Sequence, residues 1–261
     1  MGSLPPFGRW PSPTHERVTA AFERATAAVQ ERSQLHVVGS ARLGVARPDG
    51  DLDLVWAGAD GVDRAELFAA VTERLAGVGE LLAVRTVKSA GLPVLKCRFE
   101  GIAVDLQYAG LPPPLQSRAL GSLDPGELAT LDEASRRAAL GCVDADALVS
   151  LVAESYDSSV FRETLARVRE WARARQLDAG AWGLLGGYTW ALVTAWAVRA
   201  AGEAGVAAEP EALLRHFFML LAARTPGRRS LSVRRRSRGA GASRCGRSGR
   251  RRRRPSTRRV T

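Results

Sequence analysis

The stretch from Val37 to Val55, VVGSARLGVARPDGDLDLV, carries the pattern that decides the fold of this 261-residue chain. A short apolar strand runs into the turn Gly39-Ser40, and Asp51 and Asp53 follow at positions i and i+2 of a second predicted strand, over residues 52–56. Residues two apart on a strand face the same side. The pattern therefore predicts that both carboxylates converge on one point while the alternate leucines enter the core.

Two carboxylates held together repel each other unless a cation lies between them. Oxygen ligands at a strand edge suit Mg²⁺, and the Gly39-Ser40 turn offers backbone N–H groups and a hydroxyl to phosphate oxygens. Asp105 repeats the apolar–Asp–apolar pattern on a later predicted strand that could lie beside the first. Three carboxylates can hold two metal ions, as phosphoryl-transfer sites do. The simpler alternative is that these aspartates face solvent on alternating strands.

Around this stretch the hydrophobic periodicity switches between helix and strand. Residues 1–33 are predicted as a proline-rich lead-in followed by an amphipathic helix over residues 15–33. Residues 34–110 are predicted as a small α+β domain in which one helix lies beside four or five strands. The expected elements are strands over 35–38, 52–56, 81–87, 93–99 and 102–108, and a helix over 63–76.

The run Pro112-Pro113-Pro114 marks a predicted boundary, and the pattern beyond it is helical. An all-α domain is expected over residues 111–225, with helices over 132–140, 145–154, 159–175, 182–201 and 210–224. Residues 226–261 are rich in Arg, Ser and Gly and hold too few large apolar residues to build a core. A disordered basic tail is therefore expected there.

The net charge of +11 is unevenly placed along the chain. Fifteen of the 38 basic residues are arginines after residue 225, so the preceding part holds 23 basic and 27 acidic residues, a charge of −4. This split disfavours a wholly basic nucleic-acid-binding protein. No apolar run is long enough to span a bilayer, so no membrane partner is expected. Three scattered cysteines, Cys97, Cys142 and Cys245, favour neither a disulfide scaffold nor a zinc site.

Localisation is predicted from composition. The chain holds 36 arginines and only two lysines, which favours a GC-rich coding sequence and a prokaryotic, cytoplasmic protein. In a eukaryote a nuclear location is expected instead.

The combination of Gly39-Ser40, Asp51-x-Asp53 and Asp105 resembles the polymerase β-type nucleotidyltransferase superfamily. Four segments further resemble eukaryotic-type poly(A) polymerases: GSARLGV at 39–45, PVLKCRFEGIAVDLQYA at 93–109, FRETLARVREWARAR at 161–175 and GLLGGYTWALV at 183–193. The resemblance covers about residues 33–225. It implies a nucleotidyltransferase mixed-sheet domain followed by an all-α central domain, and hence an α+β fold with a basic tail.

In that family AMP is transferred from ATP to an RNA 3′ hydroxyl, so the resemblance implies a polynucleotide adenylyltransferase acting in RNA polyadenylation. Its implied partners are an RNA 3′ end and a nucleoside triphosphate, its implied cofactor is Mg²⁺ or Mn²⁺, and we expect a monomer. The implied catalytic and metal-binding residues are Asp51, Asp53 and Asp105, and the implied nucleotide-binding residues are Gly39, Ser40, Arg169, Gly187 and Tyr188.

The chain departs from the family pattern at two positions. Leu140 stands where the family has an asparagine, and Asp178 stands near a family tyrosine. These departures leave open a different nucleotide or acceptor, or a non-catalytic RNA-binding derivative of the fold. On the helix over 159–175, Arg162, Arg169 and Arg173 share one flank, which either faces phosphate or is a solvated flank paired with glutamates.

Overall fold

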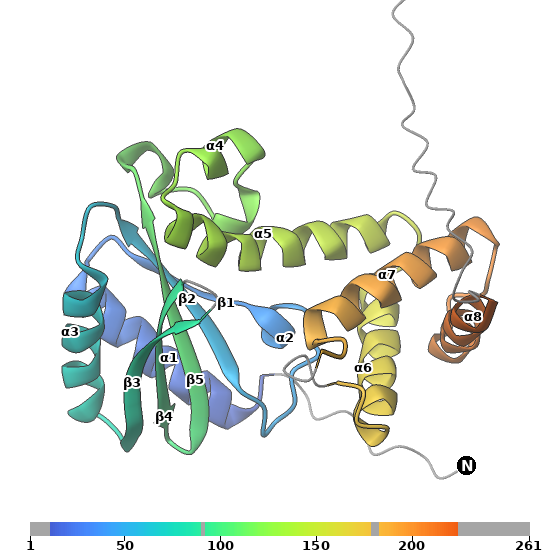
Figure 1. The fold of residues 1–261 in the computed structure, drawn as a ribbon, viewed down its shortest axis with the longest axis horizontal. Coiled ribbons are helices and arrows are strands. Elements are labelled where there is room, and N and C mark those ends of the chain that lie inside the picture. Colours follow the sequence, from blue (N-terminus) through green and yellow to red (C-terminus); the bar gives the residue numbers. More distant parts are fainter. Residues whose placement is uncertain (1–10, 90–91, 179–182, 224–261) are drawn as a thin grey trace, which may run out of the picture. The chain divides into compact units, whose positions relative to one another are not determined.

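A computed structural model describes residues 11–89, 92–178 and 183–223, and its centre is one five-stranded sheet with the order β1-β2-β5-β4-β3 (Figure 1). The strands are β1 (Gln34–Val37), β2 (Leu52–Ala59), β3 (Leu81–Ser89), β4 (Leu92–Phe99) and β5 (Ile102–Leu111). β2 and β5 run parallel, and the other neighbours run antiparallel. The sheet is therefore mixed, and the predicted α+β class is confirmed.

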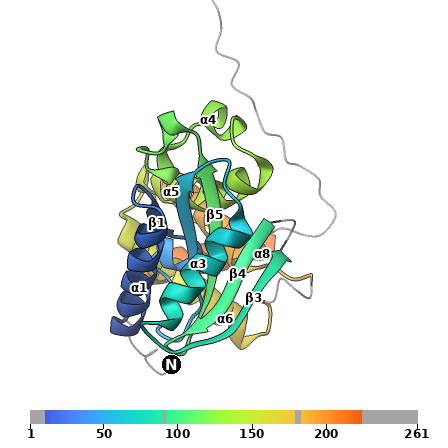
Figure 2. The same cartoon turned by 90° about the vertical axis from the view of Figure 1, so that its left-hand side faces the viewer.

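Helices α1 (Pro13–Val29) and α3 (Arg64–Ala76) cover one face of the sheet (Figure 2). Their N-termini are capped by Ser12 and Asp63, whose side chains accept hydrogen bonds from first-turn amides. Phe22 of α1 meets Phe99 of β4 edge to face at 5.8 Å between ring centroids. The sequence predicted one helix beside the sheet, whereas two helices share this core because α1 also presents an apolar stripe to it.

The opposite face is partly covered by helix α5 (Glu133–Ala153), which follows two short 3₁₀ turns and helix α4 (Pro125–Ala129). Two helices were predicted over 132–140 and 145–154, and that prediction is wrong because α5 continues through Gly141 and Cys142. Gly141 lies against the end of β1, where an added Cβ would contact Val38 at 3.5 Å. That distance is an ordinary van der Waals contact, so a side chain of alanine size would also fit where the helix passes the sheet.

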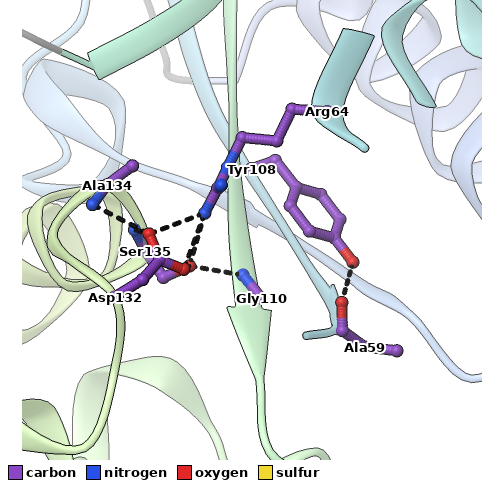
Figure 3. Close-up of polar contacts among 7 residues, drawn as sticks. All are labelled: Ala59, Arg64, Tyr108, Gly110, Asp132, Ala134 and Ser135. Atoms are coloured by element: carbon purple, nitrogen blue, oxygen red, sulfur yellow. Dashed lines mark hydrogen bonds and ion pairs between the residues drawn. The ribbon is translucent and has the colours of Figure 1, made fainter. Parts of the chain in front are cut away.

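Figure 3 shows the polar cluster that joins the N-terminus of α5 to the sheet. The Ser135 hydroxyl, fully buried, accepts a hydrogen bond from the Gly110 amide of β5 at 2.8 Å and donates to Asp132 at 2.5 Å. Arg64, at the start of α3, pairs with Asp132 at 2.8 Å. Tyr108 donates to the Ala59 carbonyl beside this cluster at 2.6 Å. The bonds made by Ser135 and Asp132 hold the N-terminus of α5 against β5 and α3, and the Tyr108 bond joins β5 to β2.

Helices α6 (Ser158–Ala174), α7 (Gly187–Glu203) and α8 (Pro210–Ala223) pack together after α5. Their shared core holds Phe161, Leu165, Trp190 and Phe217, all buried. The helix predicted from residue 182 begins at Gly187, and Trp182 lies outside the described residues. Residues 1–10 of the lead-in predicted over 1–13 and the predicted tail over 226–261 also lie outside them. None of the described helices is long and apolar enough to cross a membrane.

Candidate active site

The turn after β1 is a four-residue helix, α2 (Gly39–Arg42), that begins with the predicted Gly-Ser pair. Gly39 has φ of +62°, and a side chain there would collide with the Asp53 carboxylate. Arg42 ends the helix and binds Asp146 of α5 through two nitrogens, at 2.7 and 2.6 Å. The turn is thus pressed against Asp53 on one side and anchored to the helical domain on the other.

The predicted neighbourhood of the two strands is confirmed, because Asp53 of β2 and Asp105 of β5 are direct register partners on parallel strands. Asp51 was predicted within the strand but precedes it, since β2 begins at Leu52. Asp51 is exposed and Asp53 is partly buried. The three predicted carboxylates thus lie around the start of β2 and on its inner neighbour β5.

Burial and like charge act together on Asp53. Desolvation first, and then the neighbouring charges of Asp105 and Asp51, raise the pKa of Asp53 to about 6. Asp105 forms an ion pair with Lys96 on the adjacent strand β4. Within the described ranges no group of three or more His, Cys, Asp or Glu side chains is arranged to hold a metal ion. The carboxylates of Asp51, Asp53 and Asp105 nevertheless suit a divalent cation, because a bound cation would reduce the repulsion between their negative charges.

A cleft of about 320 Å³ brings together every residue predicted to bind nucleotide. Its described lining comes from α2, the start of β2, α6 and the start of α7: Gly39, Ser40, Leu43, Asp51, Asp53, Leu165, Arg169, Gly187 and Tyr188. Residues from four separate elements and nearly 150 positions of sequence thus face one space. Asp105 lies outside this lining.

Arg169 is the basic side chain that α6 directs into the cleft. Burial, and then the charge of Arg173, lower its pKa, and an added Cβ at Gly187 would approach its guanidinium at 3.1 Å. Arg173 is instead paired with Asp178 at 3.1 Å. The predicted arginine flank therefore divides, with Arg169 in the cleft and Arg173 held by a carboxylate.

The two departures from the family pattern occupy different surroundings. Asp178 has a side chain only 7% exposed and engages Arg173, so it offers no flat surface to a base. Leu140 is partly buried against the core between α5 and the sheet. Tyr188, at the mouth of the cleft, is 44% exposed, and burial followed by the nearby Asp144 raises its pKa. Tyr188 is thus an exposed aromatic ring at the cleft.

Three residues that organise the site were not predicted: Arg42, Asp146 and Lys96. Arg42 lies inside the GSARLGV segment, and Lys96 alternates with apolar residues on a predicted strand, so the local signals were present. The sequence did not predict which side chains they pair with, since Arg42 and Asp146, for example, are 104 positions apart.

Comparison with known proteins gives consistent matches. Residues 17–152 match the profile of the family described as poly(A) polymerase nucleotidyltransferase domain. The chain is 35% identical over 158 residues to nuclear poly(A) polymerase 2 of Arabidopsis thaliana, covering 60% of this chain and 19% of that protein. It is 33% identical over 162 residues to poly(A) polymerase PAPa of Candida albicans, covering 62% of this chain and 29% of that protein.

These alignments span less than a third of each curated relative. Among solved structures, one of Cid1, described as having RNA terminal uridylyl transferase activity, superposes with a TM-score of 0.50 at 15% identity. That superposition covers 69% of this chain and 47% of the Cid1 chain, and it supports the fold.

Proposed function

Because this chain belongs to the family of poly(A) polymerase nucleotidyltransferase domains, we propose that it transfers AMP from ATP to the 3′ hydroxyl of RNA without a template. The RNA 3′ oxygen forms a bond to the α-phosphorus of ATP, and the bond to pyrophosphate breaks. The observation that carries the proposal is the cleft in which Asp51, Asp53, Gly39, Ser40 and Arg169 face one another.

Each side of that cleft suits one part of the substrate. The Gly39-Ser40 turn presents backbone amides and a hydroxyl, and Arg169 adds a fixed positive charge in a water-poor position, where it offsets charge on the departing pyrophosphate. Asp51, Asp53 and Asp105 would hold Mg²⁺ or Mn²⁺, which supplies activation of the attacking hydroxyl and charge neutralisation at the leaving group.

The base of the nucleotide is assigned to the mouth of the cleft. Gly187 keeps the start of α7 close to Arg169, and Tyr188 stands next to it with a residue exposure of 44%. An aromatic ring stacks on any base with little selectivity. A different nucleotide is therefore the second candidate, and the observation that favours it is the absence of the family's asparagine at Leu140.

The test is incubation of the full chain with Mg²⁺ or Mn²⁺, a short RNA and each of the four labelled nucleoside triphosphates. We expect extension of the RNA with ATP, dependent on the metal ion. Extension with UTP or another nucleotide in preference to ATP would replace the adenylyl assignment but keep nucleotidyl transfer.

The controls are Asp51→Asn, which alters a proposed metal ligand, and Asp60→Asn, which alters an exposed carboxylate just past the other end of β2. The first should abolish extension and the second should leave it unchanged. An Asp51→Asn protein that extends RNA at the wild-type rate would remove this carboxylate from the reaction. RNA binding without extension by any nucleotide would favour a non-catalytic derivative of the fold.

A further inference from the structure

We propose that the charged face of strands β3 and β4 binds the phosphodiester backbone of the acceptor RNA next to its 3′ end. This inference rests on the proposed function, since it assigns the acceptor a place beside the carboxylates. Nucleotide and acceptor would then approach those carboxylates from two different clefts.

A row of charged side chains crosses four strands of the sheet. Arg85 of β3 lies opposite Lys96 of β4, Lys96 lies opposite Asp105 of β5, and Asp105 lies beside Asp53 of β2. Register partners on neighbouring strands point to the same face. The charge therefore changes sign across the sheet, with cations on β3 and β4 and carboxylates on β5 and β2.

A β-bulge brings Arg85 into that row. β3 carries one residue more than β4 between its two paired stretches, and Ala83 within the bulge has φ of +53°. If the register of Leu82 with Arg98 continued without the bulge, Val84 would lie opposite Lys96. A bulge redirects the side chains that follow it and is frequent next to active sites. Here it places the Arg85 guanidinium opposite Lys96, while Val84 of the bulge also lines the cleft on that face.

The same face is hollowed into a cleft of about 550 Å³. Arg85, Lys96 and Arg98 line it together with Asp51 and Asp105. Asp51 also lines the nucleotide cleft, so the two clefts adjoin at the carboxylates. An acceptor lying in the second cleft would thus bring its end to the position where the nucleotide is held.

The chemistry of the lining suits a phosphate backbone better than bases. Lys96 is committed to Asp105, whereas Arg85 is exposed and Arg98, also exposed, uses one nitrogen for the Gly101 carbonyl. A guanidinium has five N–H donors and binds phosphate through two at once. Neighbouring strands lie about 4.8 Å apart, so Arg85 stands roughly 10 Å from Asp105, beyond the reacting end of the acceptor.

The described lining holds five charged side chains, two alanines, Val84 and Cys97, and no aromatic ring on which a base could stack. Contacts to phosphate position a strand without reading its sequence. We therefore assign this cleft to acceptor positioning with little sequence preference.

The experiment compares Arg85→Gln/Arg98→Gln with a matched double variant, Arg24→Gln/Arg74→Gln, in the full chain. Arg24 and Arg74 are exposed and line the groove between α1 and α3, so both variants lose two positive charges and keep the same C-terminal arginines. The substrate is a hexanucleotide RNA, and its KM is measured with saturating ATP over a range of KCl concentrations.

We expect the KM for RNA to rise about tenfold in Arg85→Gln/Arg98→Gln, while the KM for ATP changes less than twofold. The slope of log KM against log salt should fall by about 1.4, since each phosphate contact to a single strand contributes about 0.7. The matched variant should behave as the wild type. An unchanged KM for RNA, or equal effects of the two variants, would overturn the proposal while leaving the proposed function in place.

A second measurement is independent of catalysis. The hexanucleotide carries 4-thiouridine at its penultimate position, and the crosslinked peptides are mapped after irradiation without nucleotide. We expect crosslinks within β3 and β4 that are lost in Arg85→Gln/Arg98→Gln and kept in the matched variant. Crosslinks confined to other segments would overturn the proposal. Failure of the wild type to extend RNA with any nucleotide would refute the proposed function, and the crosslinks would still decide where the strand binds.

Discussion

Replacing Asp53 by asparagine should stabilise the metal-free protein at neutral pH. The substitution keeps the shape of the side chain and removes one charge from a group of three carboxylates. Burial and the charges of Asp105 and Asp51 already raise the pKa of Asp53 to about 6, which means that its charged form is disfavoured in the folded state.

The size and pH range of the effect follow from that shift. The ordinary pKa of this group is 3.8 and the folded value is about 6, a difference equivalent to about 3 kcal/mol of folding free energy. A raised pKa means that the stability of the wild type is fully present below pH 3.8 and is lost as the pH rises through 6. Asp53→Asn should therefore match the wild type near pH 4 and exceed it by up to about 3 kcal/mol at pH 7.5. In a domain of this size that corresponds to roughly 6–12 °C in Tm.

The assay is thermal unfolding in EDTA at several pH values, repeated with Mg²⁺, with Asp60→Asn as the control for general charge. With Mg²⁺ at 1,000 times Kd the order should reverse, because an ion bound only by the folded wild type adds RT ln(1 + [L]/Kd), about 4.1 kcal/mol at that concentration. An Asp53→Asn protein that is less stable than the wild type at pH 7.5 in EDTA would refute the reasoning. So would a stabilisation of the same size at pH 4, because charge would then not be its cause.

The remaining predictions concern the supports of the site. Ser135→Ala should cost about 1–3 kcal/mol in urea unfolding because the buried Gly110 amide loses its acceptor, and a loss below about 0.5 kcal/mol would contradict this. Arg169→Gln should raise the KM for ATP tenfold or more without lowering Tm, since a buried cation with a lowered pKa costs the fold desolvation; an unchanged KM would remove this residue from nucleotide binding. Gly39→Ala should abolish transfer and lower the free energy of unfolding by about 1–2 kcal/mol, because φ of +62° and the Asp53 carboxylate both oppose a side chain. Wild-type activity of this variant would contradict the packing of the turn.

Much of the fold could be predicted because its signals are local. The alternation around Asp53 and Asp105 and the 3.6-residue period on either side of the sheet follow from how neighbouring residues must face a core. Element ends were predicted less well. β2 continues to Ala59, and α5 continues through Gly141, because tertiary packing extends an element beyond the part whose pattern is regular.

The sequence by itself determined the residue types of the site: a glycine turn, three aspartates, an arginine and a second glycine on a later helix. Only the tertiary structure decided which charges are committed to partners. Asp146 binds Arg42 next to the glycine turn. On α6, Asp178 binds Arg173, whereas Arg169 lines the cleft. Such pairings depend on distances between side chains from separate elements. Those distances are set by the packing of the whole core, which no local pattern encodes.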